Sequence, residues 1–262
     1  MRRWSFAIVS LMLLTPGGSL GQAAAGAPEG IESDASTRQV AITSSFTGTE
    51  ILVFGTVENS VQESPEAGTY DIAVVVEGMP QPAIVRRKAR VGGIWINVSS
   101  VRFANLPSFY AIASTRPIDE FASAELLDAE GIGFDHIPMK VTRVASAGDV
   151  KSYKEAFIRL KTEEGLYVKS NFGVSFIGRS LFRSTIALPP NVPVAPLTAR
   201  VFLFKDGKLL GRSKSTVMLE REGLERYLHS TAFSQPLLYG LATVLMAVAG
   251  GLAAAFAFRR TA

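Results

Sequence analysis

Short runs of hydrophobic residues, broken by turn residues, fill most of the chain and are typical of β-strands. Most runs have four to nine residues and are rich in Val, Ile, Phe and Tyr, and turn residues such as Gly, Pro and Asn separate the runs. In the first part of the chain the runs cover residues 39–44, 50–57, 70–77, 83–91, 94–98 and 109–114. Their spacing of about ten residues predicts a mainly β protein with an immunoglobulin-like antiparallel β-sandwich.

Strand-like runs return after residue 165, at residues 167–170, 174–177, 181–188, 197–204 and 208–219. Between the last two, Asp206 and Gly207 form the Asp-Gly pair that favours a tight hairpin. The sequence leaves open whether these strands complete the first sandwich or form a second one. We expect two lobes, at residues 38–116 and 166–221, with a flexible lead-in at residues 26–37.

Between the two groups of strands, the hydrophobic period changes and predicts a short helical insertion at residues 117–165. Pro117 suits the first turn of a helix, and Gly131 suits the position after its end. For a second helix, Asp149 is the expected N-cap and Gly165 the expected stop. The apolar residues predicted to share one face of that second helix are Tyr153, Ala156, Phe157 and Leu160.

The longest apolar segment covers residues 236–258 and contains no charged residue. As a helix it would be about 34 Å long, which is enough to cross a hydrocarbon core of about 30 Å. We therefore predict a transmembrane helix at 236–258, preceded by a juxtamembrane segment at 222–235. Because Arg259 and Arg260 follow directly, the positive-inside rule places the tail at 259–262 in the cytoplasm.

The N-terminus has the three parts of a secretory signal peptide, which we assign to residues 1–25. Basic residues come first, an apolar run follows, and small residues around Ala23 and Ala25 suit cleavage. An uncleaved anchor is the alternative, but the apolar run is short for a membrane span. In either case the part between this segment and residue 235 is predicted to lie on the exported side.

The charge distribution changes the meaning of the net charge of +4. Arg2, Arg3, Arg259 and Arg260 lie at the two ends, and without them 23 basic residues balance 23 acidic ones. The exported part is therefore formally neutral, and we expect no nucleic acid as a partner. Cysteine is absent, which excludes disulfides, thiolate metal sites and a cysteine nucleophile.

Several segments together resemble one family, the uncharacterised alphaproteobacterial transmembrane proteins. The segments that carry the resemblance are Arg86-Arg87-Lys88, Gly93-Ile94-Trp95-Ile96-Asn97, Pro107-Ser108-Phe109-Tyr110-Ala111, Arg116-Pro117, Leu181-Phe182-Arg183, Leu188-Pro189, residues 199–207 and Tyr239-Gly240. The resemblance implies an exported domain with one C-terminal helix in the bacterial inner membrane. It also implies a periplasmic location for that domain and an inner-membrane permease of the sulfite-exporter-like kind as partner.

Residues suited to catalysis are sparse, and we predict neither an enzyme nor a cofactor. His136 and His229 lie in different segments, and two distant histidines without cysteine do not make a metal site or a catalytic triad. Gly131-Ile132-Gly133 lacks the third glycine and the strand-helix context of a phosphate-binding loop. The paired carboxylates fall at predicted helix ends, where solvated acids are common.

The most distinctive polar feature is the basic strand at residues 86–90. Because side chains alternate along a strand, Arg86, Lys88 and Arg90 should project from one face, about 7 Å apart. With Trp95 they form a candidate surface for an anion, an acidic partner or lipid headgroups, with Trp95 covering the cations. A solvated sheet face or a charged edge that prevents strand pairing explains the same pattern.

A second candidate surface lies on the predicted membrane helix. Ala247, Gly251 and Ala255 recur at a spacing of four, so they share one face and permit close approach of another helix. An alanine-rich anchor without a helix partner is the alternative.

Together these features favour a non-enzymatic, single-pass inner-membrane protein. We expect its periplasmic domain to act as an accessory or scaffold to another envelope protein such as a transporter. The alternative is a periplasmic small-ligand or anion-binding module that uses the basic strand at 86–90.

Overall fold

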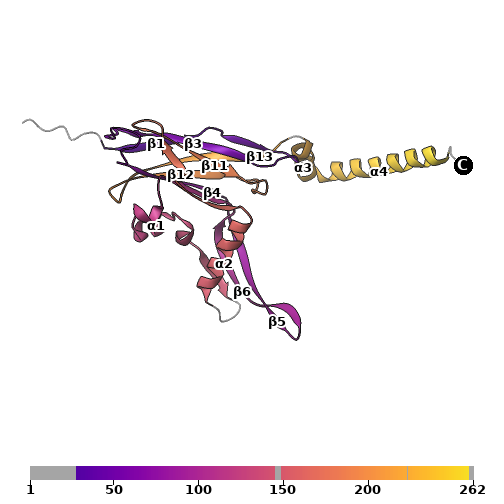
Figure 1. Ribbon diagram of the computed structural model, residues 1–262. Helices are drawn as coiled ribbons and strands as arrows, with labels where there is room; N and C mark the ends of the chain where they lie inside the picture. The colour runs from indigo at the N-terminus through magenta and orange to yellow at the C-terminus, as the bar shows by residue number, and fades with distance from the viewer. Residues whose placement is uncertain (1–27, 145–148, 223, 260–262) are drawn as a thin grey trace, which may run out of the picture.

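The computed structural model describes residues 28–144, 149–222 and 224–259 (Figure 1). The signal peptide predicted at residues 1–25 lies outside these ranges, as do residues 260–262 of the tail. The structure is mainly β, with antiparallel sheets, a few helices and one long C-terminal helix, as the sequence pattern predicts.

Thirteen strands and six helical segments make up the described chain. The strands are β1 (Gly30–Ala35), β2 (Gln39–Ile42), β3 (Thr49–Glu58), β4 (Asp71–Gly78), β5 (Pro80–Val91), β6 (Ile94–Pro107), β7 (Tyr110–Ser114), β8 (Lys140–Val144), β9 (Tyr167–Asn171), β10 (Val174–Phe176), β11 (Leu181–Leu188), β12 (Leu197–Lys205) and β13 (Lys208–Arg221). The helices are η1 (Ile118–Glu120), α1 (Ala124–Glu130), η2 (Phe134–His136), α2 (Val150–Glu163), α3 (Leu224–Ser234) and α4 (Pro236–Arg259).

Two sheets form one sandwich, so the expected division into two lobes is wrong. A four-stranded sheet has the order β1-β3-β11-β10, and a six-stranded sheet has the order β2-β13-β12-β4-β7-β9. Early and late strands therefore alternate within both sheets, because β3 pairs with β11 and β4 pairs with β12. Pairs β2/β13 and β7/β9 are parallel, and the immunoglobulin-like topology is not confirmed.

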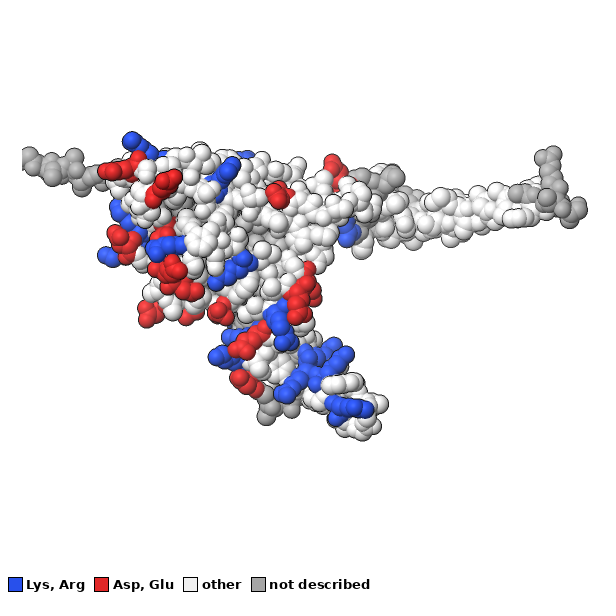
Figure 2. Space-filling view, in the orientation of Figure 1, with Lys and Arg blue, Asp and Glu red and all other residues white. Residues whose placement is uncertain are grey.

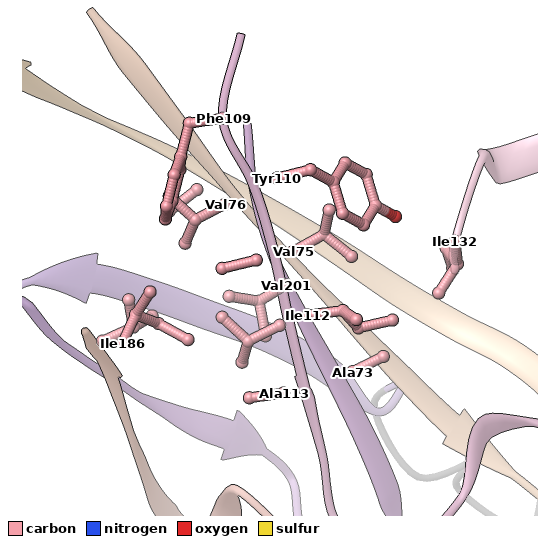
Figure 3. Close-up of a cluster of buried hydrophobic side chains, with 14 of the residues drawn as sticks. Ala73, Val75, Val76, Phe109, Tyr110, Ile112, Ala113, Ile132, Ile186 and Val201 are labelled. Carbon is pink, nitrogen blue, oxygen red and sulfur yellow. The ribbon is translucent and has the colours of Figure 1, made fainter. Parts of the chain in front are cut away.

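The hydrophobic core lies between the two sheets and continues onto the outer face of the six-stranded sheet (Figure 3). Residues 72–76 of β4 are at most 1% exposed, because this strand is covered on both faces. In Figure 3, Ile186 of β11 lies on one side of this sheet, and Tyr110 and Ile132 lie on the other. The stretch that contains η1, α1 and η2 thus covers the outer face of the six-stranded sheet, the face that does not pack against the four-stranded sheet.

Strand β3, in contrast to β4, is covered on one face only. Its residues alternate between buried and more exposed positions, with Ile51 and Val53 buried and Phe54 38% exposed. The four-stranded sheet therefore has only one covered face, and the outer face of β3 meets solvent. A run of apolar residues alone does not distinguish these two situations.

Two other expectations need correction. The segment predicted as a flexible lead-in contains β1, which pairs antiparallel with β3 and buries Ile31 and Ala35. Only two apolar side chains mark this strand, because Glu32 and Asp34 point outward, so its signal in the sequence is weak. The helical insertion also contains a strand, β8, which pairs with β6.

The local signals that depend on capping and turn chemistry are confirmed. Asp149 caps α2 by accepting a hydrogen bond from the Lys151 backbone N–H at 3.0 Å. Gly131 ends α1 with φ of 65°. Asp206 and Gly207 both have positive φ in the tight turn between β12 and β13.

A third sheet, with the order β5-β6-β8, projects from the sandwich, and we refer to it as the arm (Figure 1). Its hairpin turn at Gly92 and Gly93 is the tip, far from the base where Pro80 pairs with Pro107. The base lies at the end of the sandwich from which α4 also departs. The evidence is that Leu197 of β12 pairs with Gly78, just before β5, and with Val217 of β13, near the start of α3.

Helix α4 extends away from the sandwich (Figure 1). Its segment Pro236–Phe256 is long and apolar enough to cross a membrane, and none of it is buried against the rest of the described chain. A helix that exposes apolar residues on all sides is unstable in water and suits a lipid environment.

Candidate functional site

The arm carries the candidate residues of the basic strand on one face. In the β5/β6 register, Arg86 faces Ser100, Lys88 faces Asn97 and Arg90 faces Trp95. Opposed residues of an antiparallel pair point to the same side of the sheet, so the three cations and Trp95 share a face. Arg90 also donates from Nε to the Gly93 carbonyl oxygen at 3.3 Å, which fixes it beside the tip.

Trp95 lies beside these cations but does not cover them. Its side chain is 69% exposed. Among the described residues, the cation–π pairs are Arg116 with Phe121, Arg200 with Phe202 and Lys205 with Tyr70. The cation–π cover expected for Trp95 is therefore not formed in this structure, and the indole is available to a partner outside the chain.

Near the tip, beyond Arg87 and Ser99, the opposite face of the hairpin is apolar. Ala89 pairs with Ile96 and Val91 pairs with Ile94 on that face. Val91, Ile94 and Ile96 are 50%, 65% and 40% exposed. The tip is thus an amphipathic two-stranded ribbon, and both of its faces are open.

The base of the arm is held more firmly than the tip. Val85, Val101 and Phe103 are buried there. Helix α2 packs beside this region, and the hydroxyls of Tyr153 and Ser99 form a hydrogen bond. The contacts with α2 and with the buried residues end before the tip. The strand pair is therefore supported at its base, while the residues at its tip stay exposed.

The charge of the arm is of one sign. Strands β5, β6 and β8 contain no Asp or Glu, and their basic residues are Arg86, Arg87, Lys88, Arg90, Arg102, Lys140 and Arg143. None of the seven forms an ion pair with a residue that the structure describes. Figure 2 shows the basic side chains gathered on the arm, with acidic side chains on the neighbouring sandwich and α2. The sequence pointed to β5 alone, and pairing with β8 adds Lys140 and Arg143.

A second polar cluster lies where the C-terminal end of α1 meets the paired strands β4 and β12. Arg200 forms an ion pair with Glu77 and donates to the Glu130 carbonyl oxygen at 2.8 Å. Arg212 contacts the Glu130 carboxylate at 3.2 Å, and a cavity of about 570 Å³ opens beside these groups. Sequence analysis missed this cluster, because Glu77 and Arg200 are separated by 123 positions in the chain.

The charges of this cluster neutralise one another, which is the arrangement of a structural ion-pair network. His136 is likewise paired, with Nδ1 at 2.7 Å from an Asp128 carboxylate oxygen. Tyr110 is buried, and its hydroxyl donates to the Gly131 carbonyl oxygen at 3.0 Å and accepts from the Gly133 N–H at 2.9 Å. Within the described ranges no group of three or more metal-ligating side chains comes together.

The second candidate surface lies on α4. Ala247, Gly251 and Ala255 are exposed and lie one turn apart, on one side of the helix. Apart from the neighbouring backbone of the helix itself, no described atom lies within 4 Å of the position that a Cβ at Gly251 would take. A row of small residues therefore lies along one exposed side of the helix.

Comparison with known proteins gives one family. No curated protein matches the chain. A family model described as "Putative transmembrane protein (Alph_Pro_TM)" matches residues 30–260, from β1 to the end of α4. The match thus covers the sandwich, the arm and the membrane helix together, and the chain belongs to this transmembrane protein family.

Proposed function

We propose that the protein is a non-enzymatic, single-pass inner-membrane protein whose periplasmic sandwich acts as an accessory to another envelope protein, such as a transporter. The observation that carries the proposal is α4, an apolar helix with no described residue of the sandwich packed along its span. Within a bilayer such a helix contacts lipid or another chain. Its face of Ala247, Gly251 and Ala255 permits the close approach that helix pairing needs.

The outer face of the four-stranded sheet supports a protein partner. Phe54 on β3, Leu181 on β11 and Ile177 after β10 are 38%, 42% and 54% exposed. The register places Phe54 opposite Arg183, so Phe54 and Leu181 share this outer face, and the Ile177 N–H bonds to the Leu181 carbonyl. Neighbouring apolar side chains on an open sheet are typical of a contact surface.

The alternative of a small-anion module has less support. Arg86, Lys88 and Arg90 follow one another along an open ribbon, whereas small-molecule sites are concave and enclose most of the ligand. An extended charged surface suits an extended partner better.

The test is co-purification from detergent-solubilised membranes with the full-length, tagged protein. We expect a permease or another envelope protein to co-purify, and we expect Ala247→Leu or Gly251→Leu to reduce its amount. Ala249→Leu is the matched control, since residue 249 lies about 160° around the helix from the centre of this face. Absence of any co-purifying envelope protein with the wild-type chain would contradict the accessory role.

A further inference from the structure

The tip of the arm combines three properties that the accessory role does not use. It is exposed, it is purely basic, and its apolar residues lie nearest the turn. Val91, Ile94 and Trp95 flank Gly92 and Gly93, whereas the basic residues begin at Arg90 and continue toward the base. At about 3.4 Å per residue, Lys88 lies about 7 Å and Arg86 about 14 Å behind Arg90.

The arm leaves the sandwich at the same end as α4. The pairing of Leu197 with both Gly78 and Val217 establishes this in the sheet. In Figure 1 the hairpin runs down from the sandwich and its tip turns toward the side to which α4 extends. The membrane that α4 crosses is therefore the large surface nearest to the tip.

We propose that the tip of the arm binds the anionic surface of the membrane that α4 crosses. Ile94 and Trp95 enter the interface, and Arg90 and Lys88 bind lipid phosphates. Arg86 lies at the outer edge of the headgroup layer.

The order of residues along the hairpin matches the order of layers in a membrane. The headgroup region is about 5–8 Å thick on each side of the hydrocarbon core, so an apolar tip at its inner edge places Arg90 and Lys88 among the phosphates. Tryptophan prefers this interface, because its ring is apolar and its N–H finds a polar partner. Arg and Lys keep their charges in the polar layer while their aliphatic stems follow the apolar one.

Lipid fits the tip better than a protein groove does. The seven basic residues of the arm have neither an acidic neighbour on their own strands nor an ion-pair partner among the described residues. A uniform positive surface around an exposed apolar tip is the composition of interfacial membrane-binding elements. Specific protein interfaces, in contrast, are depleted of charged residues at their core.

The chain offers a direct probe, because Trp4 and Trp95 are its only tryptophans. The experiment uses the full-length Trp4→Phe protein in lipid nanodiscs. One set of discs contains phosphatidylglycerol and phosphatidylcholine, and the other contains phosphatidylcholine alone. We expect Trp95 emission to shift to the blue in the anionic discs and to be quenched there by lipids brominated near the headgroup.

A charge-reversed variant tests the basic residues. Each basic residue near an anionic surface contributes roughly a five-fold increase in binding, so Arg86→Glu, Lys88→Glu and Arg90→Glu together should weaken contact by more than about a hundred-fold. Quenching of Trp95 should then be lost. The matched control reverses Arg179, Arg183 and Lys208, three exposed basic residues of the sandwich that form no described ion pair. It changes the net charge equally and should keep the quenching.

Each other outcome overturns the proposal. Trp95 that stays unquenched in anionic discs shows that the tip does not reach the bilayer. Equal quenching in both kinds of disc, or quenching that survives the reversal at the tip, shows that anionic headgroups are not recognised. If Trp95 is shielded from a water-soluble quencher only in native membranes, a protein partner covers the tip. The discs contain lipid alone, so the results obtained in discs do not depend on the accessory role.

Discussion

Replacing Phe182 by alanine tests whether the sandwich is one cooperative unit. Phe182 is fully buried on β11, a late strand that pairs with the early strand β3. Its ring lies over the backbone of Gly55, where an added Cβ would be 2.7 Å from a ring carbon. It also packs edge-to-face on Phe176, at 6.4 Å between ring centroids. The side chain therefore joins three strands of one sheet to the shared core.

The expected loss follows from this burial. Removing a fully buried Phe side chain costs about 3–5 kcal/mol, since transfer energy and the remaining cavity add together. Phe54→Ala is the matched control, because Phe54 lies on the outer face of β3 and is 38% exposed. It should cost about 1 kcal/mol.

The assay is denaturant unfolding of the full-length protein in detergent, with hydrogen exchange measured segment by segment. In one sandwich, Phe182→Ala lowers protection in β4 and β7 together with β10 and β11, because these strands share a core. Reduced protection in β10 and β11 alone, with β4 and β7 unchanged, would refute the single-core account and restore two lobes.

Two further predictions concern the backbone contact at Gly55 and the buried hydroxyl of Tyr110. Gly55→Ala places a Cβ 2.2 Å from the Glu32 carbonyl oxygen, so backbone atoms must move, and it should lower the free energy of unfolding by about 1–3 kcal/mol or more. A loss below about 0.5 kcal/mol in the same unfolding assay would contradict the β1/β3 contact. Burial raises the pKa of Tyr110 above its ordinary value of 10.0, so its contribution to stability is complete below pH 10 and is lost as pH rises further. Tyr110→Phe should cost about 1–3 kcal/mol at neutral pH, because the backbone groups of Gly131 and Gly133 lose a partner. It should also flatten the alkaline fall in stability, whereas parallel pH curves would refute this assignment.

Local chemistry made part of the fold predictable from the sequence. The Asp149 cap, the Gly131 stop and the Asp206-Gly207 turn depend on residues close in the chain, and the structure has all three. Likewise, the apolar composition of 236–258 predicts α4 without reference to the rest of the molecule. The family resemblance was also correct, and the family match covers nearly the whole chain.

Strand partnership was not predictable, because it depends on contacts across more than a hundred residues. The runs that form β3 and β11 look alike whether they pair with each other or with sequence neighbours. β1 was missed, since Ile31 and Ala35 are the only buried apolar residues of that strand. The basic face of β5 followed from side-chain alternation, whereas the added charge of β8 requires knowledge of its pairing with β6.

We propose that α4 crosses the membrane and holds the sandwich on the exported side, and topology labelling tests this orientation most directly. The chain has no cysteine, so single cysteines at Ser64, in an exposed loop of the sandwich, and at Ala262 are unique labels. In intact spheroplasts, a membrane-impermeant maleimide should label the Ser64→Cys protein, and it should label the Ala262→Cys protein only after permeabilisation. Equal labelling of both proteins before permeabilisation, or the reverse order, would contradict the account.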